Sequence, residues 1–72
     1  MREQIIVFHS ITYALKAQEL LSAYGIRSSV MRHGQGWKYH GCSYGLAVRE
    51  EQIPTAVGII QSAAIRIVDI IT

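Results

Sequence analysis

The sequence predicts an α+β domain whose elements follow the order strand, helix, strand, strand, helix, strand. Three observations predict this class. Four short segments are rich in β-branched and aromatic residues, as strands are, and two longer segments carry apolar residues at helical spacing. Glycine or proline lies at boundaries between these segments, where such residues begin or end regular structure. At 72 residues the chain has room for a single domain, residues 1–72, with one modest core.

The first strand is predicted over residues 3–9, which read EQIIVFH. An extended chain places alternate residues on opposite faces of a sheet. Ile5 and Val7 are therefore predicted to face one side. Ile6 and Phe8 face the other, so that each face of this strand carries an apolar pair.

The first helix is predicted over residues 10–25, SITYALKAQELLSAYG. Ser10 or Thr12 can accept a backbone N–H at the helix N-terminus. Gly25 stands where a helix ends with a residue of positive φ. One apolar stripe is predicted to face the core, and it consists of Tyr13, Ala17, Leu20 and Tyr24 with Ala14 and Leu21 beside them.

Two strands are predicted in the middle of the chain, over residues 26–33 (IRSSVMRH) and residues 44–50 (YGLAVRE). Both show the alternation of half-buried strands. The later strand has large residues on one face and small ones on the other, with Tyr44, Leu46 and Val48 opposed to Gly45 and Ala47.

The second helix is predicted to begin near Pro54 and to run to about Ala64. Proline suits the first turn of a helix, and Glu50 and Glu51 precede it near the positive end of the helix dipole. Gly58 inside the helix either weakens it or allows close packing.

Residues 65–72, IRIVDIIT, complete the pattern as a fourth strand. The simplest compact arrangement of these elements is the ferredoxin-like βαββαβ sandwich. Its sheet has the strand order 4-1-3-2, with both helices on one face, and right-handed crossovers exclude most alternatives. The first two strands then run parallel to each other, with the third antiparallel between them.

A glycine-rich segment, residues 32–45 (RHGQGWKYHGCSYG), contains the only cysteine and the only tryptophan of the chain. The predicted topology brings it to the sheet edge where the first strand ends and the first helix begins. His9, Ser10 and Thr12 should therefore lie near Cys42. A helix N-terminus stabilises a thiolate and lowers the pKa of a thiol, so Cys42 is a candidate nucleophile or sulfur acceptor.

The same edge is a candidate anion site. Lys38, His40 and Arg32 supply positive or donor groups, and Gly41 leaves the backbone open to a small anion. With Thr12 from the helix, these residues could surround a small anion.

Two stretches of the chain resemble a known family. IIVFHSITYALKAQELLSAYGI resembles the opening of the small bacterial proteins of the DUF3343 family, described as selenium/sulfur carrier-like. CSYGLAVREEQIPTAVGII resembles their later block, in which a strand leads into a helix. The resemblance implies a carrier in which Cys42 accepts sulfur or selenium and in which His9 and Ser10 form the strand-end pair. The implied partner is a donor protein such as a cysteine desulfurase.

The sequence also departs from the family pattern. There the cysteine immediately precedes the glycine of the third strand, whereas here Tyr44 precedes Gly45 and Cys42 lies two residues earlier. The displacement moves the thiol outward into the turn. The alternative interpretation is a non-catalytic, oligomeric binding or regulatory module in which Cys42 is incidental, because lone cysteines are often small buried residues.

A metal site formed by Cys42 with His9, His33 and His40 is not predicted. Structural zinc sites have four ligands with recognisable pairs such as C-x2-C, and this chain has a single cysteine. Surface or hydrogen-bonded histidines account for the pattern, so no metal or other cofactor is expected.

Nucleic-acid binding is not predicted either. Trp37, Tyr39 and Tyr44 could stack on bases, but the first strand offers only Phe8 as a matching aromatic residue. The net charge of +2 is also mild for a nucleic-acid partner. Aromatic residues that hold a long turn together, or that cover a subunit contact, fit the pattern better.

No autonomous enzyme is expected, because the chain shows no catalytic acid–base pair and no phosphate-binding loop of the G-x-x-x-x-G-K-[ST] type. Glu50 and Glu51 are adjacent, but they lie at the other edge of the predicted sheet and suit the start of the second helix.

Composition suggests a cytoplasmic, self-associating protein. No apolar run is long enough to span a bilayer, no secretory signal is visible, and one cysteine cannot form an internal disulfide. Half of the residues are apolar and only 17% are charged, which is apolar for a small monomer. A homodimer or larger homo-oligomer is expected, with Ile59 of the second helix and one sheet edge in the contact.

Overall fold

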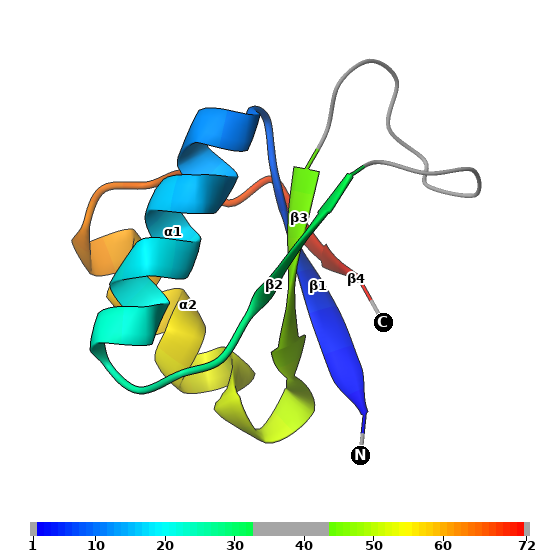
Figure 1. The fold of residues 1–72 in the computed structure, drawn as a ribbon, viewed down its shortest axis with the longest axis vertical. Helices are drawn as coiled ribbons and strands as arrows, with labels where there is room; N and C mark the ends of the chain where they lie inside the picture. Colours follow the sequence, from blue (N-terminus) through cyan, green and yellow to red (C-terminus); the bar gives the residue numbers. More distant parts are fainter. Residues whose placement is uncertain (1, 33–43, 72) are drawn as a thin grey trace.

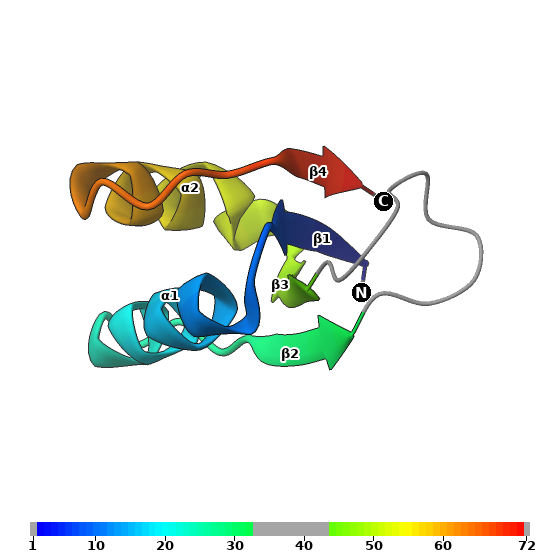
Figure 2. The same cartoon turned by 90° about the horizontal axis from the view of Figure 1, so that it is seen from above.

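The elements follow one another in the predicted order. The computed structural model describes residues 2–32 and 44–71 of the chain. The elements are β1 (Glu3–Phe8), α1 (Ile11–Ala23), β2 (Ser29–Arg32), β3 (Tyr44–Arg49), the 3-10 turn η1 (Glu50–Gln52), α2 (Ile53–Ser62) and β4 (Asp69–Ile71). Both helices cover the same face of the sheet, so the domain has two layers (Figures 1 and 2).

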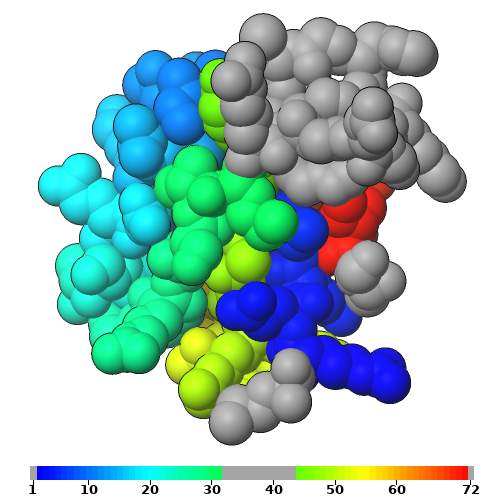
Figure 3. All heavy atoms as spheres, turned by 45° about the vertical axis from the view of Figure 1, so that its right-hand side comes forward, coloured from blue at the N-terminus to red at the C-terminus, as the bar shows by residue number. Residues whose placement is uncertain are grey.

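The four strands form one sheet in the order β2-β3-β1-β4, which is the predicted order 4-1-3-2 counted from the other edge. Each neighbouring pair is antiparallel. Because β1 and β2 both pair with β3, they run parallel to each other on either side of it. The fold is therefore the predicted ferredoxin-like α+β sandwich, and β2 lies at one edge, where Figure 3 shows it in green at the surface.

The faces of the central strands are also as predicted. Ile6 and Phe8 of β1 and Leu46 and Val48 of β3 are fully buried and belong to the core shared with the helices. Val7 alternates with them on the opposite face of the sheet and is buried as well. This core fixes the register of the sheet, because a slip of one residue would turn its large side chains away from the helices.

The helix α1 begins and ends at the predicted residues. Ser10 is its N-cap, with an extended backbone and with its Oγ accepting the N–H of Tyr13 at 3.4 Å. Thr12, the alternative cap, lies inside the helix. At the other end Gly25 has a φ of 79°, and the Ile26 N–H donates to the carbonyl of Leu21 at 2.9 Å, as in a Schellman motif.

The buried face of α1 is narrower than the predicted stripe. Its buried residues are Ala14, Ala17 and Leu21, whereas Tyr13 and Tyr24 are exposed. All three buried residues belong to the predicted stripe, and they lie at i, i+3 and i+7. Two alanines on the buried face let the helix approach the sheet closely, and the bulky tyrosines do not.

The helix α2 starts one residue before Pro54, after the turn η1, and it ends at Ser62 rather than near Ala64. It ends early because Ala64 adopts a φ of 61°, outside the helical region. Gly58 in its middle is exposed, and an added Cβ would meet nothing within 4 Å. Close packing is therefore not the reason for a glycine there.

The outer strands are shorter than the sequence predicts. β2 occupies four residues of the predicted 26–33, and β4 occupies three of the predicted 65–72. Ile65 is buried, so the chain first packs against the core before it joins the sheet. Neither helix of the described residues is long and apolar enough to cross a membrane.

Candidate functional site

The end of β1, the end of β2 and the start of β3 lie at one edge of the sheet. Phe8 pairs with Tyr44, and Tyr44 pairs on its other side with Arg32. Ser10 follows Phe8 by two residues, so α1 begins at the same edge, near the top of the molecule in Figure 1. Arg32 and Tyr44, which lie on either side of the β2–β3 connection, are therefore at the same end of the sheet as the N-terminus of α1, as the topology predicts.

Several predicted site residues lie outside the described residues. They are Cys42, Lys38, His40 and Gly41, all within residues 33–43. The same holds for His33, Trp37 and Tyr39. The proximity of Cys42 to Ser10, and the anion site that includes Lys38 and His40, therefore stay predictions.

His9, Ser10 and Thr12 form the described part of the candidate site. His9 and Thr12 are exposed, and Ser10 is half-buried. The Ser10 hydroxyl is engaged as the cap of α1, and its carbonyl accepts the N–H of Ala14 at 3.2 Å. Ser10 thus holds the first turn in place, whereas His9 and Thr12 are accessible to a partner or a ligand.

The start of α1 is electrostatically suited to an anion. Helix geometry leaves the first N–H groups, among them those of Ile11 and Thr12, without acceptors inside the helix. The first turn contains no acidic residue that would compensate their positive potential. Negative charge placed here is favoured by roughly 0.3–1 kcal/mol at an exposed helix end.

No group of three or more His, Cys, Asp or Glu residues among residues 2–32 and 44–71 is arranged to hold a metal ion. Two of the three histidines, His33 and His40, lie outside these ranges, as Cys42 does. The prediction that the chain binds no metal is therefore not tested.

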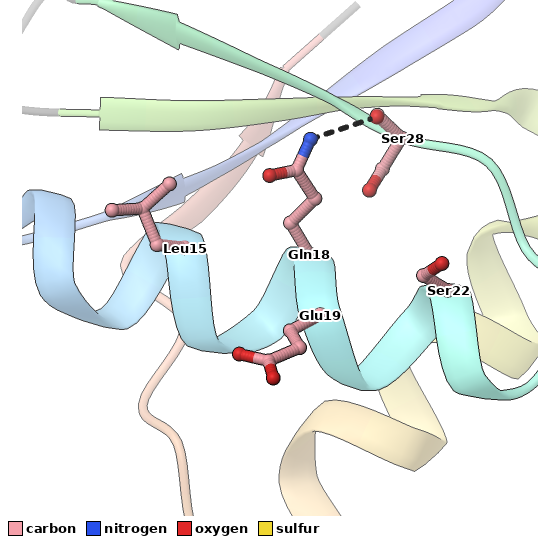
Figure 4. Close-up of a pocket in the computed structure, with 5 residues that line it drawn as sticks. All are labelled: Leu15, Gln18, Glu19, Ser22 and Ser28. Atoms are coloured by element: carbon pink, nitrogen blue, oxygen red, sulfur yellow. Dashed lines mark hydrogen bonds between the residues drawn. The ribbon is translucent and has the colours of Figure 1, made fainter.

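A pocket between α1 and the start of β2 was not predicted from the sequence. It has a volume of about 460 Å³ and is lined by Leu15, Gln18, Glu19, Ser22 and Ser28 (Figure 4). Gln18 Nε2 donates to the carbonyl oxygen of Ser28 at 3.2 Å. The Ser28 Oγ is buried, with no hydrogen-bond partner among the described residues. The only signal in the sequence was Leu15, an apolar residue outside the predicted stripe.

A second hollow lies at the opposite edge of the sheet. Gly25, Arg27, Arg49 and Gln52 line it. One of its guanidinium groups, that of Arg49, lies 4.0 Å from the Glu51 carboxylate in an exposed pair, and such pairs contribute little to stability. This hollow is separated from the edge of His9 by the length of the sheet.

These features define a small ferredoxin-like α+β domain with a polar edge at the N-terminus of its first helix. The chain belongs to the family described as "Putative Se/S carrier protein-like", whose model matches residues 3–72. The resemblance noted from the sequence is thereby confirmed over nearly the whole chain. Neither the comparison with curated proteins nor the one with solved structures gave a match.

Proposed function

We propose that the protein is a carrier of sulfur or selenium, with Cys42 as the acceptor. The observation that carries this proposal is the family match over residues 3–72, since the family is described as selenium/sulfur carrier-like. The donor would be a protein that forms a persulfide, such as a cysteine desulfurase. A reduced thiol of this kind suits the cytoplasm.

The proposed transfer is a thiolate exchange. The Cys42 thiolate attacks the outer sulfur of the donor's persulfide, the bond between that sulfur and the donor cysteine breaks, and the donor cysteine leaves as a thiolate. The outer sulfur keeps its proton and becomes bonded to Cys42, so no oxidant or reductant is needed. With a perselenide donor, selenium takes the place of the outer sulfur.

The described geometry supports this proposal. Tyr44, two residues after Cys42, pairs with Phe8 at the end of β1. Two residues of chain span at most about 7 Å, which supports the prediction that Cys42 lies at the same end of the sheet as Ser10. The uncompensated N-terminus of α1 would favour the thiolate there, and His9 is exposed beside it.

Mass spectrometry of the intact protein tests the transfer. We expect the wild-type protein, after incubation with a cysteine desulfurase and cysteine, to gain the mass of one sulfur atom and to lose it on treatment with dithiothreitol. Cys42→Ser should gain none. A wild type that gains nothing, or an equal gain in Cys42→Ser, would contradict the proposal. The same incubation with a selenium donor shows which element is transferred faster.

The thiol itself provides a second test. We expect iodoacetamide to alkylate native Cys42 with a midpoint pH below about 8.5, the pKa of an ordinary free thiol. Unfolding the protein in urea should return the midpoint to the ordinary value, because the helix N-terminus is then lost. Equal midpoints in both states, or an unreactive native thiol, would favour the alternative of a binding or regulatory module in which Cys42 is incidental.

A further inference from the structure

Tyr44 is the first residue of β3, the strand that lies between β1 and β2 in the sheet. It pairs with Phe8 of β1 on one side and with Arg32 of β2 on the other. Figure 1 shows the start of β3 near the top of the molecule, where α1 also begins. Tyr44 is therefore placed where the β2–β3 connection joins the sheet, at the same end as the N-terminus of α1.

The side chain of Tyr44 packs against the core that the sheet shares with the helices. Alternation along β3 puts Tyr44 on the same face as Leu46 and Val48, which are both fully buried in this core. Tyr44 itself is half-buried and packs against the same cluster. Because an aromatic side chain buries a large apolar area, the ring anchors the start of β3 to the helix layer.

Among the described residues of β3, the next two positions cannot replace this anchor. Gly45 has no side chain, and glycine inside a strand weakens the strand. Ala47 is small and lies with Gly45 on the face of the sheet away from the helices. The first large side chain after Tyr44 on the helix face is that of Leu46. Without the ring of Tyr44, β3 would therefore be anchored to the core only from Leu46 onward.

The position of the anchor limits how far Cys42 can move from the sheet. Cys42 lies outside the described residues, two positions before Tyr44 and four before Leu46. Two residues of extended chain span at most about 7 Å, whereas four residues span about 14 Å. The electrostatic effect of a helix N-terminus falls off within one turn, which is about 5 Å. A thiol tethered at Tyr44 can therefore stay within this effect, and one tethered at Leu46 can leave it.

We infer that Tyr44 is a positioning residue for the sulfur acceptor: its packed ring holds the start of β3, and thereby keeps Cys42 at the N-terminus of α1. The inference rests on the proposed function, because it takes Cys42 as the acceptor. Tyr44 acts through the location of the thiol and not through contact with the transferred sulfur. The ring is the part that matters, so phenylalanine should replace tyrosine without loss.

The pH dependence of Cys42 alkylation by iodoacetamide in the native protein tests this role. At an exposed helix end, the stabilisation of a negative charge corresponds to a thiol pKa lowered by about 0.2–0.7. Tyr44→Ala should therefore raise the alkylation midpoint by about 0.2–0.7 pH units, which is roughly a twofold to fivefold loss of thiolate at neutral pH. Tyr44→Phe keeps the ring and should leave the midpoint at the wild-type value.

Two further variants separate positioning from a general loss of stability. Val48→Ala removes a fully buried side chain from the same face of β3, about 13 Å further along the strand, and should leave the midpoint unchanged. Insertion of two glycines between Ser43 and Tyr44 keeps the ring but doubles the reach of Cys42, so it should raise the midpoint as Tyr44→Ala does. If Tyr44→Ala fails to fold by circular dichroism, Tyr44→Thr, a strand-forming residue without a ring, replaces it.

The inference is overturned if the midpoint does not rise in the ringless variant or in the glycine insertion. An equal rise in Val48→Ala or in Tyr44→Phe overturns it too, as does a wild type with the midpoint of an ordinary thiol. Sulfur gain by mass spectrometry is a separate readout. A wild type that gains no sulfur contradicts the proposed function, although a raised midpoint in Tyr44→Ala would still support the positioning role. Sulfur gain with an unchanged midpoint in Tyr44→Ala supports the carrier and overturns the inference.

Discussion

The two halves of the sandwich, β1–α1–β2 and β3–α2–β4, end their helices in the same way with different residues. After α1 the residue of positive φ is Gly25, and after α2 it is Ala64, at 79° and 61°. The next residue, Ile26 or Ile65, donates its N–H to the carbonyl five residues earlier, at 2.9 Å and 3.2 Å. Both isoleucines are only 6% exposed.

This comparison separates two contributions to a helix end. Glycine makes the left-handed conformation inexpensive, whereas alanine adopts it at a cost of about 1 kcal/mol or more. Because α2 ends in this geometry with alanine, glycine is not required for it. Burial of the following isoleucine, which has the same exposure in both halves, is the contribution that the two ends share.

The helix N-termini, in contrast, differ in structure. α1 has a side-chain cap at Ser10, with exposed polar neighbours. α2 has no side-chain cap at Gln52, contains Pro54 in its first turn, and buries Ile53. The start of α2 is thus a packed turn, and the start of α1 is an accessible polar end. Of two equivalent ends in a nearly symmetric fold, only the first is suited to a reactive site.

The largest expected effect tests the shared contribution. Ile26→Ala and Ile65→Ala should each lower the free energy of unfolding by about 2–4 kcal/mol, because each removes a buried side chain. Urea denaturation of both variants measures the losses. If burial of the isoleucine determines where α2 ends, Ile65→Ala should lower the free energy of unfolding at least as much as Ile26→Ala does. A loss below about 1 kcal/mol for Ile65→Ala would show that the end of α2 is determined locally.

The next prediction exchanges glycine and alanine at the two positions of positive φ. Gly25→Ala should destabilise the fold by about 1 kcal/mol, and Ala64→Gly should stabilise it by up to about 1 kcal/mol. Thermal and urea unfolding of the two variants give the signs. Two changes of the same sign would contradict the view that both positions have the same backbone requirement.

An effect of similar size is expected from the side-chain cap that distinguishes the N-terminus of α1 from that of α2. Ser10→Ala should lower the free energy of unfolding by about 1 kcal/mol, because the Tyr13 N–H loses its acceptor. Gln52→Ala is the matched control at α2, where no side-chain hydrogen bond is lost. It should change the free energy of unfolding by less than about 0.5 kcal/mol. Equal losses would mean that the cap at Ser10 contributes nothing specific.

The smallest effect contrasts two glycines. Gly58 lies in the interior of α2, with open space around an added Cβ. Gly58→Ala should therefore stabilise the protein by about 0.5–1 kcal/mol, through the better helix propensity of alanine. This is opposite in sign to Gly25→Ala, although the chemical change is identical. Destabilisation by Gly58→Ala would contradict the open space around the added Cβ.

For Ile59, the structure adds information that the sequence did not contain. The second helix has two apolar faces, and the sequence suggested that one of them contacts another subunit. In the structure Val57 and Ile59 are partly buried and pack against the core of their own chain. Ile59→Glu would therefore disturb the fold itself, so it is not a clean test of association.

The candidate site could be predicted in part. Ser10 was identified because an N-cap has a local signature, serine just before an apolar, helix-periodic stretch. Gln18 and Ser28 were missed, because they meet only when α1 packs beside β2, ten residues along the chain. No periodicity or spacing in the sequence indicates that contact.

Element order, the two ends of α1, the start of α2 and the strand faces followed from the sequence alone. They depend on alternation, on the backbone freedom of Gly25 and on the restriction at Pro54, which are properties of neighbouring residues. Which residues of the predicted α1 stripe are buried did not follow from it. Ala14 and Tyr13 are both compatible with a helical stripe, and packing against the sheet chose the smaller residue. Burial depends on contacts between segments far apart in the chain, so it was decided only when the helices and strands came together.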